Sequence, residues 1–141
     1  MTRLILSIKA VSEIFSVSDN HANNRLVELL GQDTINSNLK SKGIEQVRIA
    51  HRLGYHSDDL ATKPLIIYMN DSTTASYEGT INTSAKPLEL NNVLKGSGFY
   101  EGDELIEEPF DFSMKNRYSI DAQHGVLKRV IFPDKFKKDE R

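Results

Sequence analysis

The side chains best suited to chemistry lie together in one short stretch, Ser18-Asp19-Asn20-His21. A hydroxyl, a carboxylate, an amide and an imidazole follow one another here, so hydrogen-bond donors and acceptors are concentrated within a few residues. Short polar side chains of this kind are also typical of ordinary turns and of helix N-caps. Ser-Asp-Asn is therefore a weak motif by itself, and its interpretation depends on the elements on either side.

Two predicted helices flank this stretch. Apolar residues at helical spacing predict the first helix over roughly residues 3–16. The second helix is predicted to carry Ala22, Leu26 and Leu29 on one face and to stop at Gly31. The polar stretch is thus expected to form the turn between two helices and to cap the second one.

Short extended segments are predicted after a third helix. That helix is capped by Asp33 or Thr34 and ends at Gly43. Residues 47–49 and 65–69 have the β-branched and aromatic content of short strands.

The rest of the chain predicts one further helix after two irregular regions. Residues 71–92 are rich in Ser, Thr and Asn and are expected to form irregular surface. Residues 95–108 contain three glycines and are expected to form a mobile loop. The last helix is predicted to begin near Ser119 or Asp121 and to end before Pro133.

The motif and its surroundings resemble the class A β-lactamase-like serine hydrolases, the penicillin-recognising enzymes. In that family Ser-x-x-Lys, Ser-Asp-Asn and Lys-Thr/Ser-Gly follow in this order, and the Ser-Asp-Asn loop joins two helices and forms one wall of the active site. The resemblance is tightest over residues 8–53. It implies that Ser18 passes a proton toward the leaving group of an acyl substrate. It also implies that Asn20 hydrogen-bonds the substrate and the catalytic lysine, and that Asp19 braces the loop.

The other motifs of this family are missing from the 141 residues. No Ser-x-x-Lys precedes Ser18, and Ser37-Asn38-Leu39-Lys40 has the right letters but lies downstream, in a polar run on the predicted third helix. Neither Lys-Thr-Gly nor Lys-Ser-Gly occurs. The sequence therefore lacks the nucleophile of this chemistry, and it also lacks the residues for an oxyanion hole and a substrate carboxylate grip.

The loop that would hold the deacylating base also departs from the family pattern. β-Lactamases of this class carry Arg-x-Glu-x-x-Leu-Asn there, whereas this chain keeps Arg52, as structural support, and has Gly54 in place of the glutamate. Asp58 or Asp59 would substitute only in a rearranged loop. Because no carboxylate is poised to activate water, the parent enzyme is expected to be esterase-like or peptidase-like rather than antibiotic-destroying.

The composition and the histidines exclude several other classes. A formal charge of -2 gives no general attraction to nucleic acid, and no apolar run is long enough to cross a bilayer. The absence of cysteine excludes disulfides and thiol catalysis. His51 and His56 suggest a metal site, but no third ligand has recognisable spacing. We therefore expect no metal and no cofactor.

Together these observations predict a mainly α fold with short extended segments, the helical subdomain of a β-lactamase-like α/β serine hydrolase. It is expected to form one incomplete domain over residues 1–133, with a charged tail at residues 134–141. We expect the chain to be inactive alone and to self-associate through apolar faces of its first two helices. The parent is expected to act outside the cytoplasmic membrane, on an export signal that this chain does not carry. The alternative is a non-catalytic binding module that keeps the helical scaffold.

Overall fold

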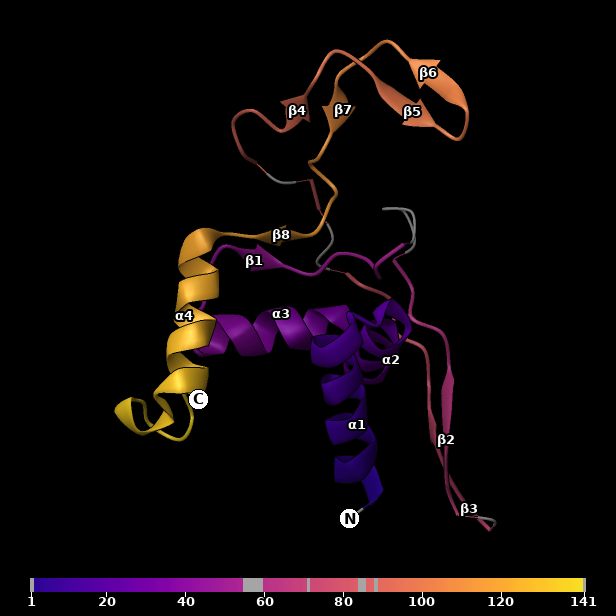
Figure 1. Ribbon diagram of the computed structural model, residues 1–141, viewed down its shortest axis with the longest axis vertical. Coiled ribbons are helices and arrows are strands. Elements are labelled where there is room, and N and C mark those ends of the chain that lie inside the picture. Colours follow the sequence, from indigo (N-terminus) through magenta and orange to yellow (C-terminus); the bar gives the residue numbers. More distant parts are fainter. Residues whose placement is uncertain (1, 55–59, 71, 84–85, 88, 141) are drawn as a thin grey trace.

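The computed structural model describes residues 2–54, 60–70, 72–83, 86–87 and 89–140. Within them the chain forms four α-helices, one 3-10 helix and eight short strands (Figure 1). The fold is thus a mixture of α and β structure, and the prediction of a mainly α chain is not confirmed. None of the described helices combines the length and apolarity that crossing a membrane requires.

Three helices open the chain. They are α1 (Thr2–Val17), α2 (Asn20–Leu30) and α3 (Gln32–Ser41). The first two were predicted within one or two residues, and α1 packs against α2.

Gly31 separates α2 from α3 by a single residue. Its φ of 77° is left-handed, which a glycine adopts without the Cβ penalty of other residues. Gly31 therefore ends α2 and also occupies the N-cap position of α3. The prediction that Asp33 or Thr34 caps α3 is wrong, because the chain changes direction at once and the helix begins at Gln32.

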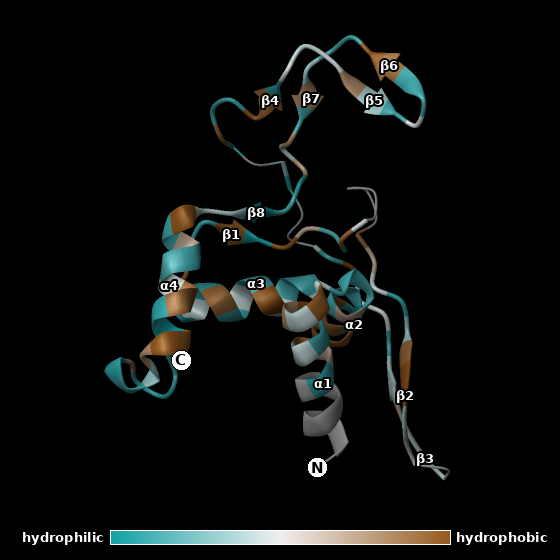
Figure 2. Ribbon diagram, in the orientation of Figure 1, coloured by the Kyte–Doolittle hydropathy of each residue, from teal (hydrophilic) through white to brown (hydrophobic). Residues whose placement is uncertain are grey.

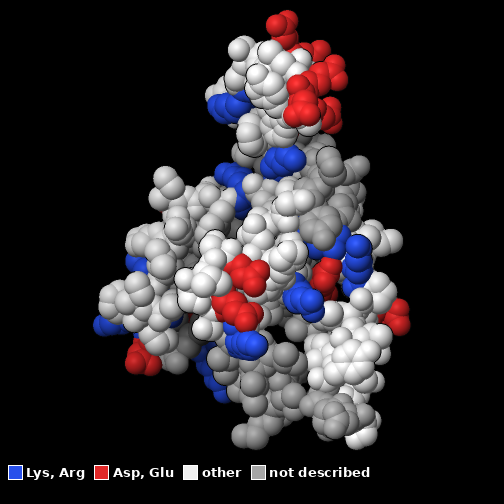
Figure 3. All heavy atoms as spheres, turned by 45° about the vertical axis from the view of Figure 1, so that its right-hand side comes forward, with Lys and Arg blue, Asp and Glu red and all other residues white. Residues whose placement is uncertain are grey.

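The strands form four separate antiparallel pairs. The pairs are β1 (Val47–Arg48) with β8 (Arg117–Tyr118), β2 (Leu65–Asn70) with β3 (Thr73–Tyr77), β4 (Leu94–Lys95) with β7 (Phe110–Asp111), and β5 (Phe99–Glu101) with β6 (Glu104–Ile106). The β4–β7 and β5–β6 pairs make an arm that projects from the helices, and the β2–β3 hairpin extends on the side of α1 and α2 (Figure 1). Acidic side chains gather at the end of the arm (Figure 3).

Two predictions of irregular structure are wrong in part. Thr73–Tyr77 pairs with β2, although it lies in the Ser- and Thr-rich region expected to be irregular. Phe99–Glu101 and Glu104–Ile106 form a hairpin inside the expected mobile loop, with Gly102 in its turn at a φ of 62°. In both cases strand pairing supplies backbone hydrogen bonds that composition alone does not reveal.

The last helix, α4 (Ile120–Ile131), begins and ends where the sequence predicted. Ser119 caps it by accepting a hydrogen bond from the N–H of Ala122, and a 3-10 turn, η1 (Pro133–Lys135), follows. The residues beyond fold back on the helix, because Arg129 stacks on Phe136 and donates to a backbone carbonyl of the tail.

Among the residues whose burial is described, few of the buried side chains are apolar. The hydrophobic members are Ala22, Val27, Ile44, Ala50 and Ala122. The polar members are Asn24, Gln32, His51, Arg52, Thr62, Asn82 and Ser113. Apolar residues are otherwise spread over the helices and strands (Figure 2). Polar contacts therefore account for much of how the segments near the candidate site are held in place.

Candidate functional site

Ser18 lies in the turn between α1 and α2. Its φ of 54° is left-handed, a conformation that is uncommon for a residue with a Cβ. The chain turns here from α1 into α2, and both Ser18 and Asn20 are exposed. The turn therefore exposes a hydroxyl and an amide to solvent at the start of α2, with Asp19 between them in the sequence.

Asp19 is the N-cap of α2. Its Oδ1 accepts hydrogen bonds from the N–H of His21 at 2.7 Å and from the N–H of Ala22 at 3.2 Å. These are two of the donors that every helix leaves without a partner in its first turn. The Asp19 carboxylate therefore binds the backbone of the turn that carries Ser18 and Asn20.

Replacing Asp19 with alanine is expected to lower the free energy of unfolding by about 1 kcal/mol, because the cap is lost. Asp19→Asn keeps an oxygen acceptor and is expected to lose only a few tenths of that value. Urea denaturation followed by circular dichroism measures both. An equal loss in the two variants would mean that the charge of Asp19, and not its capping geometry, stabilises the turn.

One face of α2 continues from the turn as a row of polar side chains. Asn20, Asn24 and Glu28 are four residues apart and so lie along the same side of the helix. The second and third members of this row bind the segment that ends at Leu53.

Asn24 holds the backbone of Leu53 with both ends of its amide. The Leu53 N–H donates to Oδ1 at 2.8 Å, and Nδ2 donates to the Leu53 carbonyl at 2.8 Å. Asn24 is only 9% exposed, so these two bonds are made away from bulk water. The segment before Gly54 is therefore fixed to the same helix that begins at Asn20.

One helical turn further along the row, Glu28 binds Arg52. Its guanidinium pairs with the carboxylate of Glu28, and Arg52 is 2% exposed. The arginine that the sequence marked as structural support thus has its partner on α2. His51 is also buried, and its Nδ1 lies 2.8 Å from the Arg52 carbonyl.

Three further asparagines bind the same segment, and one of them, Asn82, donates to the Ala50 carbonyl at 2.9 Å. Asn116 Oδ1 accepts from the N–H groups of Ala50 and His51 at 2.7 and 3.0 Å, and its Nδ2 donates to the His51 carbonyl at 2.9 Å. Asn36 on α3 accepts from the Ile49 N–H and donates to the Ile49 carbonyl in the same way. The chain from Ile49 to Leu53 is therefore fixed by side-chain amides almost residue by residue.

These amide contacts were not predicted from the sequence. The available signal was the presence of asparagine inside predicted helices, at Asn24 and Asn36, where its helix propensity is poor. An asparagine inside a helix therefore suggests that its amide binds the backbone of another segment.

Arg48 ties the strand β1 to two loops. Its guanidinium donates to the carbonyls of Lys86, Ser113 and Lys115. Burial, followed by the nearby charge of Arg117, lowers the pKa of Arg48 from its ordinary value. Arginine stays protonated nonetheless, so Arg48 acts as a cationic clamp.

The remaining candidates lie outside this arrangement. Ser37 is exposed and donates to the carbonyls of Asp33 and Thr34 in its own helix. His56 and the two acids of the loop after Gly54 fall outside the described residues. Among the residues that are described, no group of three or more His, Cys, Asp or Glu side chains is arranged to hold a metal ion.

Two hollows occur elsewhere on the surface. One of about 380 Å³ lies between α1, α2 and β2, and a more open one of about 850 Å³ lies beside α3 and β1. Neither is lined by Ser18 or Asn20. The turn is thus an exposed edge and not the wall of either hollow.

Comparison with known protein families places this arrangement in a class. The sequence model of the Beta-lactamase enzyme family, Beta-lactamase2, matches residues 7–93. This span includes the Ser18 turn, the polar row of α2, and the segment held at Leu53. The chain belongs to the β-lactamase enzyme family, as its resemblance predicted. No curated protein and no solved structure matches the chain.

Proposed function

We propose that this chain forms one wall of an acyl-transfer site, with Ser18 as a proton shuttle and Asn20 as a hydrogen-bonding group for the substrate. The observation that carries the proposal is the polar row on α2. It joins the exposed Ser18–Asn20 turn to Arg52 and Leu53, so the turn and the segment that ends at Leu53 are held by the same helix. Membership of the β-lactamase enzyme family supports the class of reaction.

The chemistry proposed for each group is that of the family motif, and the surroundings of each group are compatible with it. In acyl transfer a serine hydroxyl attacks the acyl carbon, and the leaving nitrogen or oxygen must receive a proton. The attacking hydroxyl gives its proton to the catalytic amine, and the Ser18 hydroxyl relays a proton from that amine by accepting it and donating its own proton to the leaving atom. The Asn20 amide donates to the substrate carbonyl and accepts from the catalytic amine. Asp19 acts only through these neighbours, because its Oδ1 is bound by two backbone N–H groups.

Deacylation is expected to be slow. Asn24 fixes Leu53, and the next residue, Gly54, has no side chain with which to activate a water molecule. Gly54 has a left-handed φ of 75°, which favours glycine over a residue with a side chain such as glutamate. The acyl-enzyme is therefore proposed to persist, which suits an esterase or peptidase of low turnover better than a β-lactamase.

The nucleophile is proposed to come from another polypeptide segment, because these residues contain no Ser-x-x-Lys before Ser18. The outer side of α1 offers a place for such a segment to pack. Val11 is 43% exposed and Phe15, one helical turn later, is 86% exposed. This apolar side of α1 lies close in sequence to the turn that carries Ser18.

Covalent labelling tests the proposal. The 141-residue chain is treated with a fluorescent fluorophosphonate and a fluorescent penicillin, and no label is expected. A label on the isolated chain would show that it has its own nucleophile and would contradict this part of the proposal.

Activity is then measured in the protein that contains this chain together with a Ser-x-x-Lys segment. Ser18→Ala is expected to slow acylation by roughly 10²- to 10⁴-fold, the usual contribution of a positioned acid-base group. Ser16→Ala is the matched control, since the Ser16 hydroxyl is bound to the Ser12 carbonyl. Equal rates for the Ser18 and Ser16 variants would remove Ser18 from the mechanism.

The exposed side of α1 also leads us to propose that the isolated chain self-associates. Phe15→Asp places a charge in that surface and is expected to lower the weight-average mass in sedimentation equilibrium. Tyr100→Asp, on the projecting arm and 72% exposed, is the control and is expected to change it little. If only the Tyr100 variant dissociates, the contact is on the arm and not on α1.

A further inference from the structure

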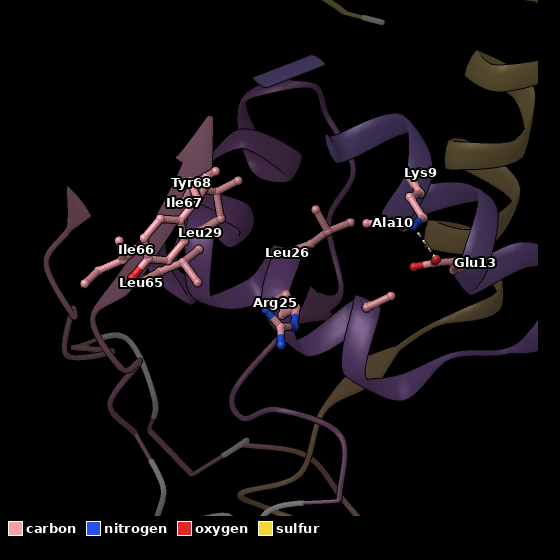
Figure 4. A pocket seen from close by; sticks show the side chains of 11 residues that line it. Lys9, Ala10, Glu13, Arg25, Leu26, Leu29, Leu65, Ile66, Ile67 and Tyr68 are labelled. Atoms are coloured by element: carbon pink, nitrogen blue, oxygen red, sulfur yellow. Dashed lines mark ion pairs between the residues drawn. The ribbon is translucent and has the colours of Figure 1, made fainter. Parts of the chain in front are cut away.

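The hollow between α1, α2 and β2 has the dimensions of a small-molecule site. Its volume of about 380 Å³ falls in the range of ligand pockets. The helices contribute Ala10, Ala22, Leu26 and Leu29, and the strand contributes the run from Leu65 to Tyr68. Figure 4 shows Leu29 beside the residues of the strand, with Leu26 further toward α1. The walls are therefore mainly apolar.

Three charged residues line the same hollow. Lys9 and Glu13 lie one turn apart on α1, and their charged atoms are 3.8 Å apart. Arg25 on α2 makes no hydrogen bond or ion pair with any described residue. In Figure 4 the Lys9–Glu13 pair lies on one side of the hollow, with Arg25 between it and the strand. The charges of Lys9 and Glu13 cancel, so the guanidinium of Arg25 gives the lining of this apolar hollow a net charge of one positive unit.

We propose that this hollow binds an aliphatic carboxylate, a monoanion with an unbranched hydrocarbon chain. The chain packs against Leu26, Leu29 and the β2 side chains, and burial of each methylene group stabilises the complex. The carboxylate pairs with Arg25, whose planar guanidinium donates two parallel hydrogen bonds to such a group. A single surplus positive charge matches a monoanion better than a phosphate dianion. This site is separate from the proposed acyl-transfer wall, because neither Ser18 nor Asn20 lines it.

Isothermal titration of the 141-residue chain with decanoate tests the site, with decanol as the uncharged ligand of equal chain length. One decanoate is expected to bind per chain. Arg25→Gln is expected to weaken decanoate binding by about tenfold or more, because a charge-assisted pair is lost, and to leave decanol binding unchanged. Lys128→Gln, on the exposed surface of α4, is the matched control and is expected to change neither.

A second variant tests the location. Ala10→Phe fills the hollow and is expected to abolish binding of both ligands, while far-ultraviolet circular dichroism confirms that the helices are retained. The proposal is overturned if decanoate does not bind, if several equivalents bind, or if binding survives Ala10→Phe. It is equally overturned if the Arg25 and Lys128 variants bind decanoate alike. It is also overturned if Ala10→Phe alters self-association, seen as a change in sedimentation coefficient, but leaves decanoate binding as it was, because the hollow would then receive a polypeptide segment.

Discussion

Replacing Arg52 with methionine is expected to lower the free energy of unfolding by about 3–5 kcal/mol, the usual result of removing one partner of a buried ion pair. Arg52 is 2% exposed, and the Glu28 side chain is 16% exposed. Methionine fills much of the same space, so the loss reports on the Glu28 carboxylate left without its cation. Urea denaturation followed by circular dichroism measures the change.

The double variant of Glu28 and Arg52 separates the ion pair from packing. Glu28→Gln combined with Arg52→Met is expected to be more stable than Arg52→Met alone, because no charge is then left unpaired. Arg25→Met is the matched control, because Arg25 is an exposed arginine on α2, the helix that carries Glu28. It is expected to change the free energy of unfolding by less than about 0.5 kcal/mol. If Arg52→Met behaves like this control, the buried pair does not hold the segment.

Replacing Asn24 with leucine is expected to lower the free energy of unfolding by about 2–3 kcal/mol. Leucine is similar in size to asparagine, but it leaves the N–H and the carbonyl of Leu53 without their partner. Hydrogen exchange adds a local measurement, because the Leu53 amide is expected to lose most of its protection. If that amide exchanges at the same rate in both proteins, the clamp does not form in solution.

Asn24→Asp tests the same clamp by pH. The introduced carboxyl, when protonated, donates to the Leu53 carbonyl and accepts from the Leu53 N–H, as the amide does. When ionised it faces the carbonyl oxygen, so its pKa is expected to be higher in the folded than in the unfolded protein. Stability of this variant is therefore expected to be greatest at low pH and to fall as the pH rises through the folded-state pKa.

The control for both Asn24 variants is Asn38→Ala on α3. Asn38 is an exposed helical asparagine, so its replacement changes helix propensity without removing a buried amide. It is expected to be neutral or slightly stabilising at every pH.

Local signals were enough to predict the helices and the turn. Apolar spacing gave α1 and α2 their positions, Gly31 ended α2, and Pro133 marked the end of α4. Each of these features depends on local properties of the chain. Glycine permits a left-handed φ, proline lacks an N–H, and a capping side chain reaches only the next turn of backbone. The same locality explains why Asp19 was expected at the bend before its two hydrogen bonds were known.

Pairing between distant segments could not be predicted in this way. The β2–β3 and β5–β6 hairpins lie in regions whose Ser, Thr and Gly content suggested loops. Asn116 binds Ala50 and His51, which are 66 and 65 positions away, and no periodicity relates them to it. A strand or an amide clamp depends on which backbone groups meet across the fold, and that is decided when the whole chain packs.

The sequence by itself determined the family and the motif, a hydroxyl and an amide in the bend between two helices, because both depend on the order of residues along the chain. The tertiary structure decided what that bend is attached to. Asn24 and Glu28 on α2 reach the backbone of Leu53 and the guanidinium of Arg52, 29 and 24 residues away. Such contacts arise because buried polar groups must find partners away from water, and only the packed fold brings those partners within reach.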